Sequence, residues 1–280
     1  MIMELQKKID FAIKLLQSIP QDGPIELCYS GGKDSDVILE LAKMAGIPFD
    51  AIYKNTTIDP PGTLAHCREN GVRIVQPQKS FYQLVEYAGL PNRWHRLCCN
   101  ALKEYKIHDR AIIGIRRCES TARAKRYKEP EECRIYKNGE RVRHYFPVLD
   151  WTDADVVRFI SERGIKCHPL YYDTDGHFHA ERRLGCIGCP MSPKKAIESY
   201  KQYPTVLKGT IRAMKRRLDT KECGAWHKYF GGDIYAVMYF QLFTNSMDEF
   251  YRTTTSELFP ELNIDYKQYL EDYFGIDLTV

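Results

Sequence analysis

One short segment of the chain has the residue types and spacing that bind a phosphate. Ser30-Gly31-Gly32-Lys33-Asp34-Ser35 lies between an apolar run and a stretch whose apolar residues recur at helical spacing. Backbone N–H groups and the helix dipole favour an anion at such a helix start, the glycines allow close approach, and Lys33 adds charge. The spacing matches neither G-x-x-x-x-G-K-[ST] nor G-x-G-x-x-G. The alternative that stays open is an ordinary Gly-Gly turn with a solvated lysine.

Four cysteines form a second set with chemical potential. Cys98 and Cys99 are adjacent, and the pair Cys186 and Cys189 begins 87 residues after Cys99. Four thiolates suit a [4Fe-4S] cluster or a structural zinc ion. Adjacent cysteines are awkward as two ligands of one small ion and easier across a larger cubane, so the spacing favours the cluster over zinc or unmetalled thiols. Five further cysteines are expected to be mostly small buried hydrophobes: Cys28, Cys67, Cys118, Cys133 and Cys167.

Composition limits the kind of protein that can carry these groups. The chain has 280 residues, 44% hydrophobic and 28% charged, with a formal net charge of +4, which fits one large or two modest folded domains. No stretch approaches the roughly 18 apolar residues of a membrane span, and the first ten residues do not resemble an export signal. We therefore expect a cytoplasmic protein with no membrane association, whose ten cysteines serve metal or redox chemistry.

Alternating strand and helix patterns predict the elements that position these residues. Apolar runs predict strands at 25–29, 49–53, 72–75 and 111–115, and helical periodicity predicts helices at 5–19, 37–45, 62–69, 82–87, 100–108 and 153–163, the last capped by Thr152 or Asp153. This alternation predicts an α/β fold with a mostly parallel sheet and flanking helices. The pattern dissolves between 116 and 143, and after 185 the chain reads as helical. We expect a nucleotide-binding α/β domain over 1–193 and a helical C-terminal extension over 194–280.

With further motifs, these residues resemble the phosphoadenosine phosphosulfate (PAPS) reductase family of the PP-loop, or adenine nucleotide alpha hydrolase-like, superfamily. The resemblance covers about residues 24–193 and is closest to mobile-element and DNA-phosphorothioation-type members. Besides the loop and the four cysteines, it rests on Asn55-Thr56-Thr57-Ile58-Asp59-Pro60-Pro61, Arg93-Trp94, Leu102-Lys103-Glu104, Gly114-Ile115-Arg116-Arg117, Glu119-Ser120, Arg123 and Pro147-Val148-Leu149-Asp150-Trp151.

The resemblance implies binding of ATP or an adenylyl sulfate and reaction at the α-phosphate. It implies catalytic roles for Lys33 and Asp34, and a [4Fe-4S] cluster on the four cysteines. Asp34 could also help to hold Mg²⁺ on the phosphates, or merely cap the helix. The nucleotide-binding residues that it implies are Ser30, Gly31, Gly32, Lys33, Asp34, Ser35, Thr57, Asp59, Lys103, Arg116, Arg117 and Arg123.

Cys223 is a further candidate nucleophile. Glu222-Cys223-Gly224 followed by His227 resembles the motif in which sulfonucleotide reductases attack sulfur, and nearby cations would lower the pKa of the thiol. The histidine stands three residues after the glycine, whereas the family has it two after, and 57 residues follow the cysteine. These departures put the catalytic role of Cys223 in doubt.

Two basic stretches suggest anionic partners. Residues 110–143 hold eleven Lys or Arg against five Glu, and residues 194–228 hold ten against three acidic residues. The second stretch could track a nucleic-acid backbone, although solvated charge and aromatic residues in the core are equally ordinary explanations.

Three functions follow. The first is a PP-loop enzyme that activates an acceptor by adenylylation for sulfur transfer from a donor. The second is a reductase of adenylyl sulfate (APS) or PAPS, in which Cys223 forms a thiosulfonate and a thioredoxin-like protein releases sulfite. The third is a non-catalytic nucleotide or nucleic-acid binding component of a larger complex.

Overall fold

The computed structural model describes residues 2–136, 138–220, 224–244, 246–254 and 264–280. The chain forms two compact units that interleave along the sequence. The first consists of Met1–Asn55, Pro60–Gln76 and Glu104–Gly185, and the second of Thr56–Asp59, Pro77–Lys103 and Cys186–Val280.

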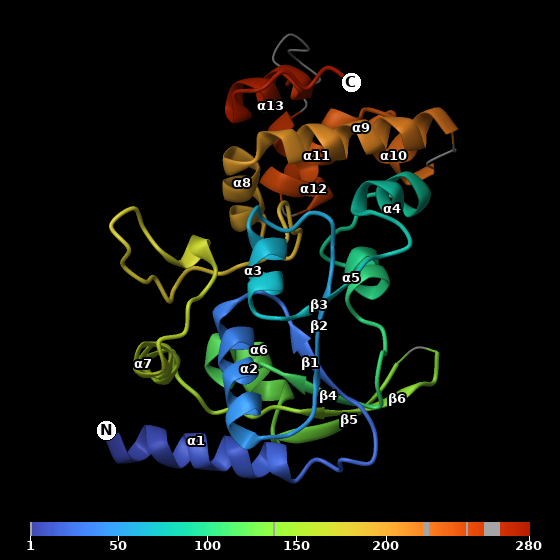
Figure 1. Cartoon of the computed structure of the whole chain (residues 1–280). Coiled ribbons are helices and arrows are strands. Elements are labelled where there is room, and N and C mark those ends of the chain that lie inside the picture. The colour runs from blue at the N-terminus through green and yellow to red at the C-terminus, as the bar shows by residue number, and fades with distance from the viewer. Residues whose placement is uncertain (1, 137, 221–223, 245, 255–263) are drawn as a thin grey trace. The chain divides into compact units, whose positions relative to one another are not determined.

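A six-stranded sheet forms the centre of the first unit (Figure 1). Its strands are β1 (Ile25–Tyr29), β2 (Asp50–Lys54), β3 (Arg73–Val75), β4 (Arg110–Ile113), β5 (Glu131–Ile135) and β6 (Arg141–Tyr145). Their spatial order is β3-β2-β1-β4-β6-β5, and every pair is parallel except β5 with β6. In the register, Leu27 of β1 faces Ala51 on one side and Ile112 on the other. The mostly parallel α/β fold predicted from the sequence is confirmed.

The helices of this unit bury one apolar face each. In α2 (Lys33–Ala45), Val37, Ile38, Leu41 and Ala45 are buried, and the helix ends where Gly46 adopts a left-handed conformation with φ 66°. α2 contacts β1 and β4 together with α1 (Ile2–Gln17) and α7 (Asp153–Arg163). α7 begins with a capping box in which Thr152 and Asp155 exchange hydrogen bonds, as the sequence predicted for Thr152. The first unit also contains α3 (Thr63–Glu69), η1 (Arg117–Glu119), α6 (Thr121–Arg126) and η2 (Pro169–Tyr171).

Three expectations about local structure are wrong. Residues 116–143 are not irregular, because they form η1, α6, β5 and β6. The hairpin strands carry many charged side chains, and in β5 burial merely alternates between exposed and half-buried, so the apolar signal is weak. Helix 100–108 is instead α5 (Leu97–Leu102), and α2 begins at Lys33 rather than at residue 37.

The second unit is helical around its own apolar core. Its helices are α4 (Phe81–Ala88), α5, α8 (Pro193–Gln202), α9 (Pro204–Thr220), α10 (Gly224–Phe230), α11 (Ile234–Phe243), α12 (Met247–Thr254) and α13 (Tyr266–Phe274). Leu207, Ile211, Met214, Met238 and Leu270 are buried in this core. Because residues 56–59 and 77–103 pack with these helices, the compact units do not coincide with the ranges 1–193 and 194–280, and that domain boundary stays a prediction.

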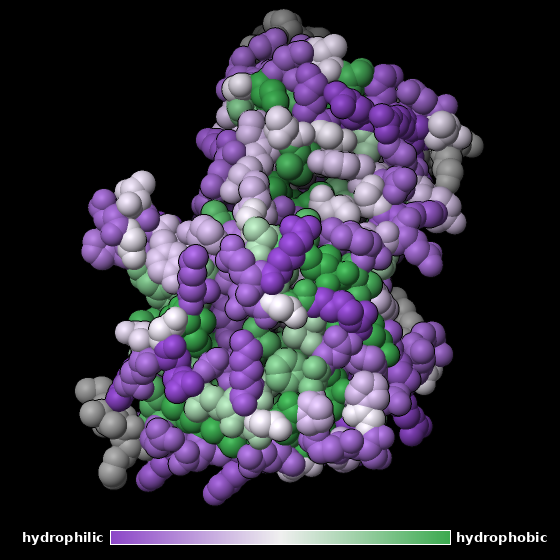
Figure 2. Space-filling model, in the orientation of Figure 1, coloured by the Kyte–Doolittle hydropathy of each residue, from purple (hydrophilic) through white to green (hydrophobic). Residues whose placement is uncertain are grey.

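The face of the molecule drawn in Figure 2 is mainly polar. On the face drawn in Figure 2, hydrophilic side chains cover most of the molecule and hydrophobic ones show between them. Among the described helices, none is both long enough and apolar enough to cross a membrane.

Gly114, just after β4, allows a close main-chain approach to Asp34. A Cβ atom at this position would lie 2.9 Å from the carbonyl oxygen of Asp34, and a carbonyl cannot rotate away as a side chain can. We expect Gly114→Ala to lower the free energy of unfolding by about 1–3 kcal/mol, measured by urea denaturation. The matched control is Gly23→Ala, whose new Cβ would meet only Arg110 Nη1 at 3.4 Å. Equal stability of the two variants would contradict this packing.

Candidate functional site

The loop predicted to bind phosphate lies at a switch point of the sheet. β1 has β2 on one side and β4 on the other, and all three strands are parallel. The segments that follow β1 and β4 therefore emerge at the same edge, where open α/β sheets bind their ligands. Residues 30–35 follow β1, and Gly114 and Arg116 follow β4. The contact of Gly114 with Asp34 joins these two segments directly.

The loop itself presents main-chain amides at the start of α2. Gly31 has φ 78°, a conformation that favours glycine. Gly32 is the N-cap residue and has no side chain that accepts hydrogen bonds from the first main-chain amides of the helix. The Lys33 amide donates to the Tyr171 hydroxyl at 3.2 Å, and the Leu184 amide donates to the same oxygen at 3.4 Å. The Tyr171 hydroxyl thus accepts a hydrogen bond from a main-chain amide at the start of a helix, where a phosphate oxygen is also favoured.

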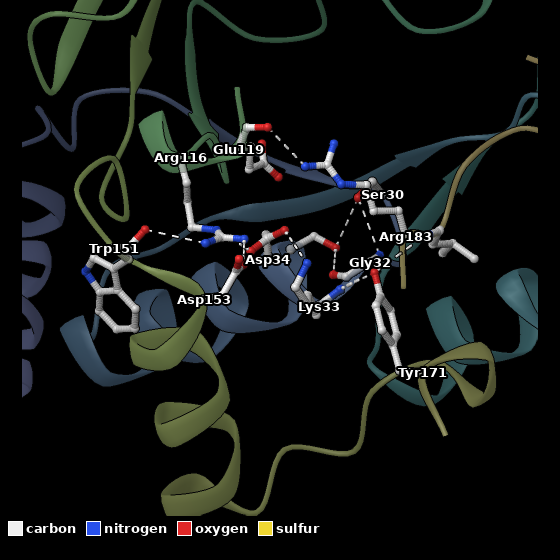
Figure 3. A network of polar contacts seen from close by, with 12 residues as sticks. Ser30, Gly32, Lys33, Asp34, Arg116, Glu119, Trp151, Asp153, Tyr171 and Arg183 are labelled. Atoms are coloured by element: carbon white, nitrogen blue, oxygen red, sulfur yellow. Dashed lines mark hydrogen bonds and ion pairs between the residues drawn. The ribbon is translucent and has the colours of Figure 1, made fainter. Parts of the chain in front are cut away.

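Asp34 joins two cations next to this loop (Figure 3). Its Oδ1 accepts a hydrogen bond from Arg116 Nε at 2.7 Å, and its Oδ2 lies 3.3 Å from Lys33 Nζ. Gly32, not Asp34, caps α2, so the expectation that Asp34 merely caps the helix is wrong. Lys33 is 3% exposed, which places its charge in a largely desolvated environment. Whether Asp34 helps to hold Mg²⁺ stays a prediction.

Arg116 is buried, and each of its three guanidinium nitrogens donates a hydrogen bond within the protein. Besides Asp34, its guanidinium donates to Asp153 Oδ1 at 2.8 Å, to Cys118 Sγ at 3.0 Å and to the Trp151 carbonyl at 3.4 Å. Burial lowers its pKa, but the carboxylates of Asp34 and Asp153 outweigh that effect and raise it. Arg116 therefore positions Asp34 in this structure, and its predicted contact with a nucleotide stays untested.

The other predicted arginines lie in the same unit. Arg117 pairs with Asp150 and donates to the carbonyls of Tyr127 and Lys128. Arg123 pairs with Glu119.

Sequence reasoning missed three residues of this network. Asp153 contacts Arg116, and Tyr171 contacts Lys33. The third residue is Arg183, whose Nη2 donates to the Glu119 carbonyl at 3.3 Å. The pKa of Arg123 is lowered, by burial first and then by the neighbouring charge of Arg183. The adjacent pair Arg182-Arg183 shortly before Cys186 was the one signal in the sequence that could have indicated Arg183.

The four predicted cysteine ligands lie together in the second unit. Cys98, Cys99, Cys186 and Cys189 line one small cavity of about 30 Å³, whose other walls are mainly apolar. The remaining lining residues are Thr56, Ile58, Phe81, Leu102, Lys103, Gly188 and Pro190. The structure thus brings together two cysteine pairs that are far apart in the sequence, as a shared metal centre requires.

The spacing of the sulfur atoms bears on the two metal centres considered for this cavity. In tetrahedral zinc sites with bonds of about 2.3 Å, the sulfurs lie roughly 3.8 Å apart. Within the described part of the chain, the groups of three donor atoms that gather within 4.8 Å include no three of these cysteines; Asp173, Asp175 and His177 form such a group in a largely exposed loop. The choice between a cluster and a zinc ion stays a prediction.

Charged groups beside the cavity affect the cysteine thiols. Burial raises the pKa of Cys186 to about 11, which Lys103 opposes and Asp59 reinforces. The pKa of Cys99 is lowered to about 6 by a hydrogen bond with Cys98 and by Arg96. Lys103 Nζ also lies 3.9 Å from Asp59 Oδ1.

Three predicted nucleotide-binding residues belong to the cysteine-containing unit. Thr57, Asp59 and Lys103 all lie in the second unit. Thr57 Oγ1 accepts a hydrogen bond from the Phe81 amide at 2.8 Å, and Asp59 accepts one from Thr56 at 2.5 Å. Their predicted contact with the nucleotide is not tested by these contacts.

The remaining cysteines divide into two groups. Cys67 and Cys167 are buried and Cys28 is half-buried, whereas Cys118 and Cys133 are exposed, so the expectation of burial is wrong for these two. Cys118 lies at the surface, where its sulfur accepts a hydrogen bond from Arg116. Cys133 lies on the edge strand β5. Cys223, the candidate nucleophile, lies outside the described residues.

The arrangement of the first unit is that of the nucleotide-binding α/β proteins, which hold a phosphate group at a glycine loop after the first strand. The chain belongs to the phosphoadenosine phosphosulfate reductase domain family, whose model matches residues 24–192. The family resemblance seen in the sequence is confirmed. The likeness to mobile-element and DNA-phosphorothioation-type members stays a prediction.

Curated relatives carry the name sulfate adenylyltransferase subunit 2. The protein of Mycolicibacterium vanbaalenii is 31% identical over 214 residues, covering 65% of this chain and 67% of the relative. That of Mycobacterium sp. (strain JLS) is 30% identical over 207 residues, covering 62% and 66%. The chain thus matches about two thirds of the length of these relatives. A solved structure, the PAPS reductase of Candida auris in a phosphate complex, is 17% identical, with a TM-score of 0.45 over 65% of this chain and 93% of that one.

The ion pairs of Arg116 allow a direct test. Arg116→Ala leaves Asp34 and Asp153 without their shared cation, and we expect the free energy of unfolding to fall by about 2–3 kcal/mol, the partial exposure of both acids limiting the loss. Arg117→Ala removes a partly exposed guanidinium and should cost about 1 kcal/mol or less. Urea denaturation of both variants decides the matter, since equal losses would mean that Arg116 has no special structural role.

Proposed function

We propose that the chain is a PP-loop enzyme that binds ATP at residues 30–35, activates an acceptor by adenylylation and serves sulfur transfer. The observation that carries this proposal is the glycine loop at the switch point of the sheet, with Asp34 fixed between Lys33 and Arg116. Membership of the family supports chemistry on adenine nucleotides. The name of the curated relatives supports adenylyl transfer in particular.

In this proposal an acceptor oxygen attacks the α-phosphorus of ATP. A bond forms between that oxygen and phosphorus, and the bond to the bridging oxygen of the β-phosphate breaks, so that pyrophosphate leaves with the electron pair. The amides at the start of α2 and the Lys33 ammonium stabilise the negative charge on the phosphates. Arg116 acts through Asp34, which it holds in place. A sulfur nucleophile from a donor then displaces AMP from the activated acceptor.

Cys98, Cys99, Cys186 and Cys189 are the residues that would hold a [4Fe-4S] cluster. The shared cavity and the wide spacing of their sulfurs support this ligand set over zinc. When bound, the cluster would supply an electron-transfer or sulfur-binding centre. Lys103 places a positive charge beside Cys186 and so favours the thiolate that ligation requires.

A second candidate is the sulfonucleotide reductase reaction, because the name of the matching family is that of a reductase. In that reaction the Cys223 thiolate would attack the sulfur of APS or PAPS, and AMP or adenosine bisphosphate would leave. A thioredoxin-like protein would then release sulfite from the thiosulfonate. The relatives' designation as a subunit also supports a partner protein, and a binding role within such a complex is the third candidate.

The nucleotide site is tested with Lys33→Ala. Loss of this buried ammonium should weaken ATP binding at least about tenfold in calorimetric titration, because an ionic contact with phosphate is lost. Lys43→Ala, on the exposed side of the same helix, is the control and should bind ATP like the parent. Unchanged affinity of Lys33→Ala would refute the loop assignment. Pyrophosphate release from ATP by the parent would support adenylylation, whereas sulfite release from APS would favour the reductase.

The metal centre is tested with Cys186→Ser in protein purified without oxygen. We expect the parent to be brown and to contain about four iron atoms per chain, and the variant to lose both the absorbance and most of the iron. Cys133→Ser, on the exposed edge strand, is the control and should keep them. A colourless parent with stoichiometric zinc would rule out the cluster.

A further inference from the structure

Arg183 brings an uncompensated positive charge to the network around the loop. Lys33 and Arg116 are balanced by Asp34 and Asp153, and Arg123 is balanced by Glu119. Arg183 donates to the Glu119 main-chain carbonyl, which carries no formal charge. Within the described residues, no carboxylate lies within ion-pair distance of Arg183. The network therefore has one cation more than it has anions.

Arg183 and Arg123 are also close enough to affect each other. Glu119 contacts both, through its side chain for Arg123 and through its carbonyl for Arg183. Two like charges side by side cost free energy, and the charge of Arg183 adds to burial in lowering the pKa of Arg123. Such a pair of guanidiniums is stabilised when an anion with several oxygens binds between them.

The segment that carries Arg183 is attached to the phosphate loop. The neighbouring Leu184 amide donates to the Tyr171 hydroxyl, which also accepts from the Lys33 amide. Leu184 Cδ2 lies so near Gly31 that a Cβ there would be 3.1 Å away. Figure 3 shows Arg183 in the same network as Ser30 and Gly32, with its guanidinium directed toward Glu119. Arg183 is thus held next to the loop by its own neighbour in the chain.

We propose that Arg183, together with Arg123, binds the anionic group joined to the α-phosphate of the nucleotide. This inference rests on the proposed nucleotide site and adds Arg183 to it as the residue that distinguishes nucleotides with a second anionic group beyond the α-phosphate from those without one. The group is the pyrophosphate of ATP or the sulfate of adenylyl sulfate, since both present several oxygens to two guanidiniums. AMP lacks this group and gains nothing from Arg183.

Calorimetric titration with ATP, adenylyl sulfate and AMP tests the proposal. We expect Arg183→Ala to weaken the binding of at least one of the first two ligands by about tenfold or more, because a charge-assisted contact is lost. The ligand that is affected identifies which anionic group is held. Binding of AMP should change by less than about twofold, and Arg183→Lys, which keeps the charge but not the planar fork, should lie between parent and Arg183→Ala. Lys125→Ala, an exposed charge on α6, is the matched control and should bind all three ligands like the parent.

Two results would overturn the inference without touching the nucleotide site. One is a parent that binds ATP or adenylyl sulfate while Arg183→Ala binds both equally well. The other is an equal loss for AMP and for the other two ligands, which would mean that the substitution disturbs the loop as a whole. A parent that binds none of the three ligands would instead refute the proposed nucleotide site, and the inference with it.

Discussion

The buried guanidinium of Arg116 is the constraint on which the candidate nucleotide site depends. A charge at 1% exposure is tolerated only when it is paired and hydrogen-bonded, and the partners of Arg116 come from two separate helices. Asp34 is in the first turn of α2, and Asp153 is in the first turn of α7. Arg116 itself follows β4, which pairs with β1. One side chain thereby fixes the start of two helices against the edge of the sheet, and with them the orientation of the loop amides.

Main-chain packing makes this ionic arrangement possible. Arg116 can reach Asp34 because Gly114 lets the chain after β4 pass against the Asp34 carbonyl. Gly31 plays the same part on the other side of the loop, where Leu184 and Thr63 approach it. Both glycines are needed for close approach, and Gly31 also has a backbone conformation that other residues rarely adopt. The loop is therefore shaped by its neighbours as much as by its own sequence.

How far the sequence predicts this structure depends on how each feature is encoded. β1 and α2 were predictable, because strand β1 is buried on both faces and α2 repeats its apolar residues at helical spacing. The β5–β6 pair was not predictable, because many of its residues are charged and partly exposed. It joins the sheet through the pairing of β6 with β4, which is a contact of the folded chain and not a local pattern. The type of Arg116 suggested a phosphate ligand, but its actual partners, Asp34 and Asp153, are 82 and 37 residues away. For Arg183 the sequence offered only the adjacent Arg182 as a signal, since its position depends on contacts with Glu119 and with the loop, which only the fold creates.

The cysteine cavity illustrates a different limit. Sequence spacing can show that two cysteine pairs exist, but only the fold brings them to one cavity and sets the distance between their sulfurs. The cavity is mostly apolar, so that an isolated thiolate is costly there, as the raised pKa of Cys186 shows. Lys103 offsets part of that cost, and a cationic metal centre would offset the rest. The cavity gathers four thiols, of which Cys186 has a raised pKa and Cys99 a lowered one, and this arrangement supports the ligand set proposed above.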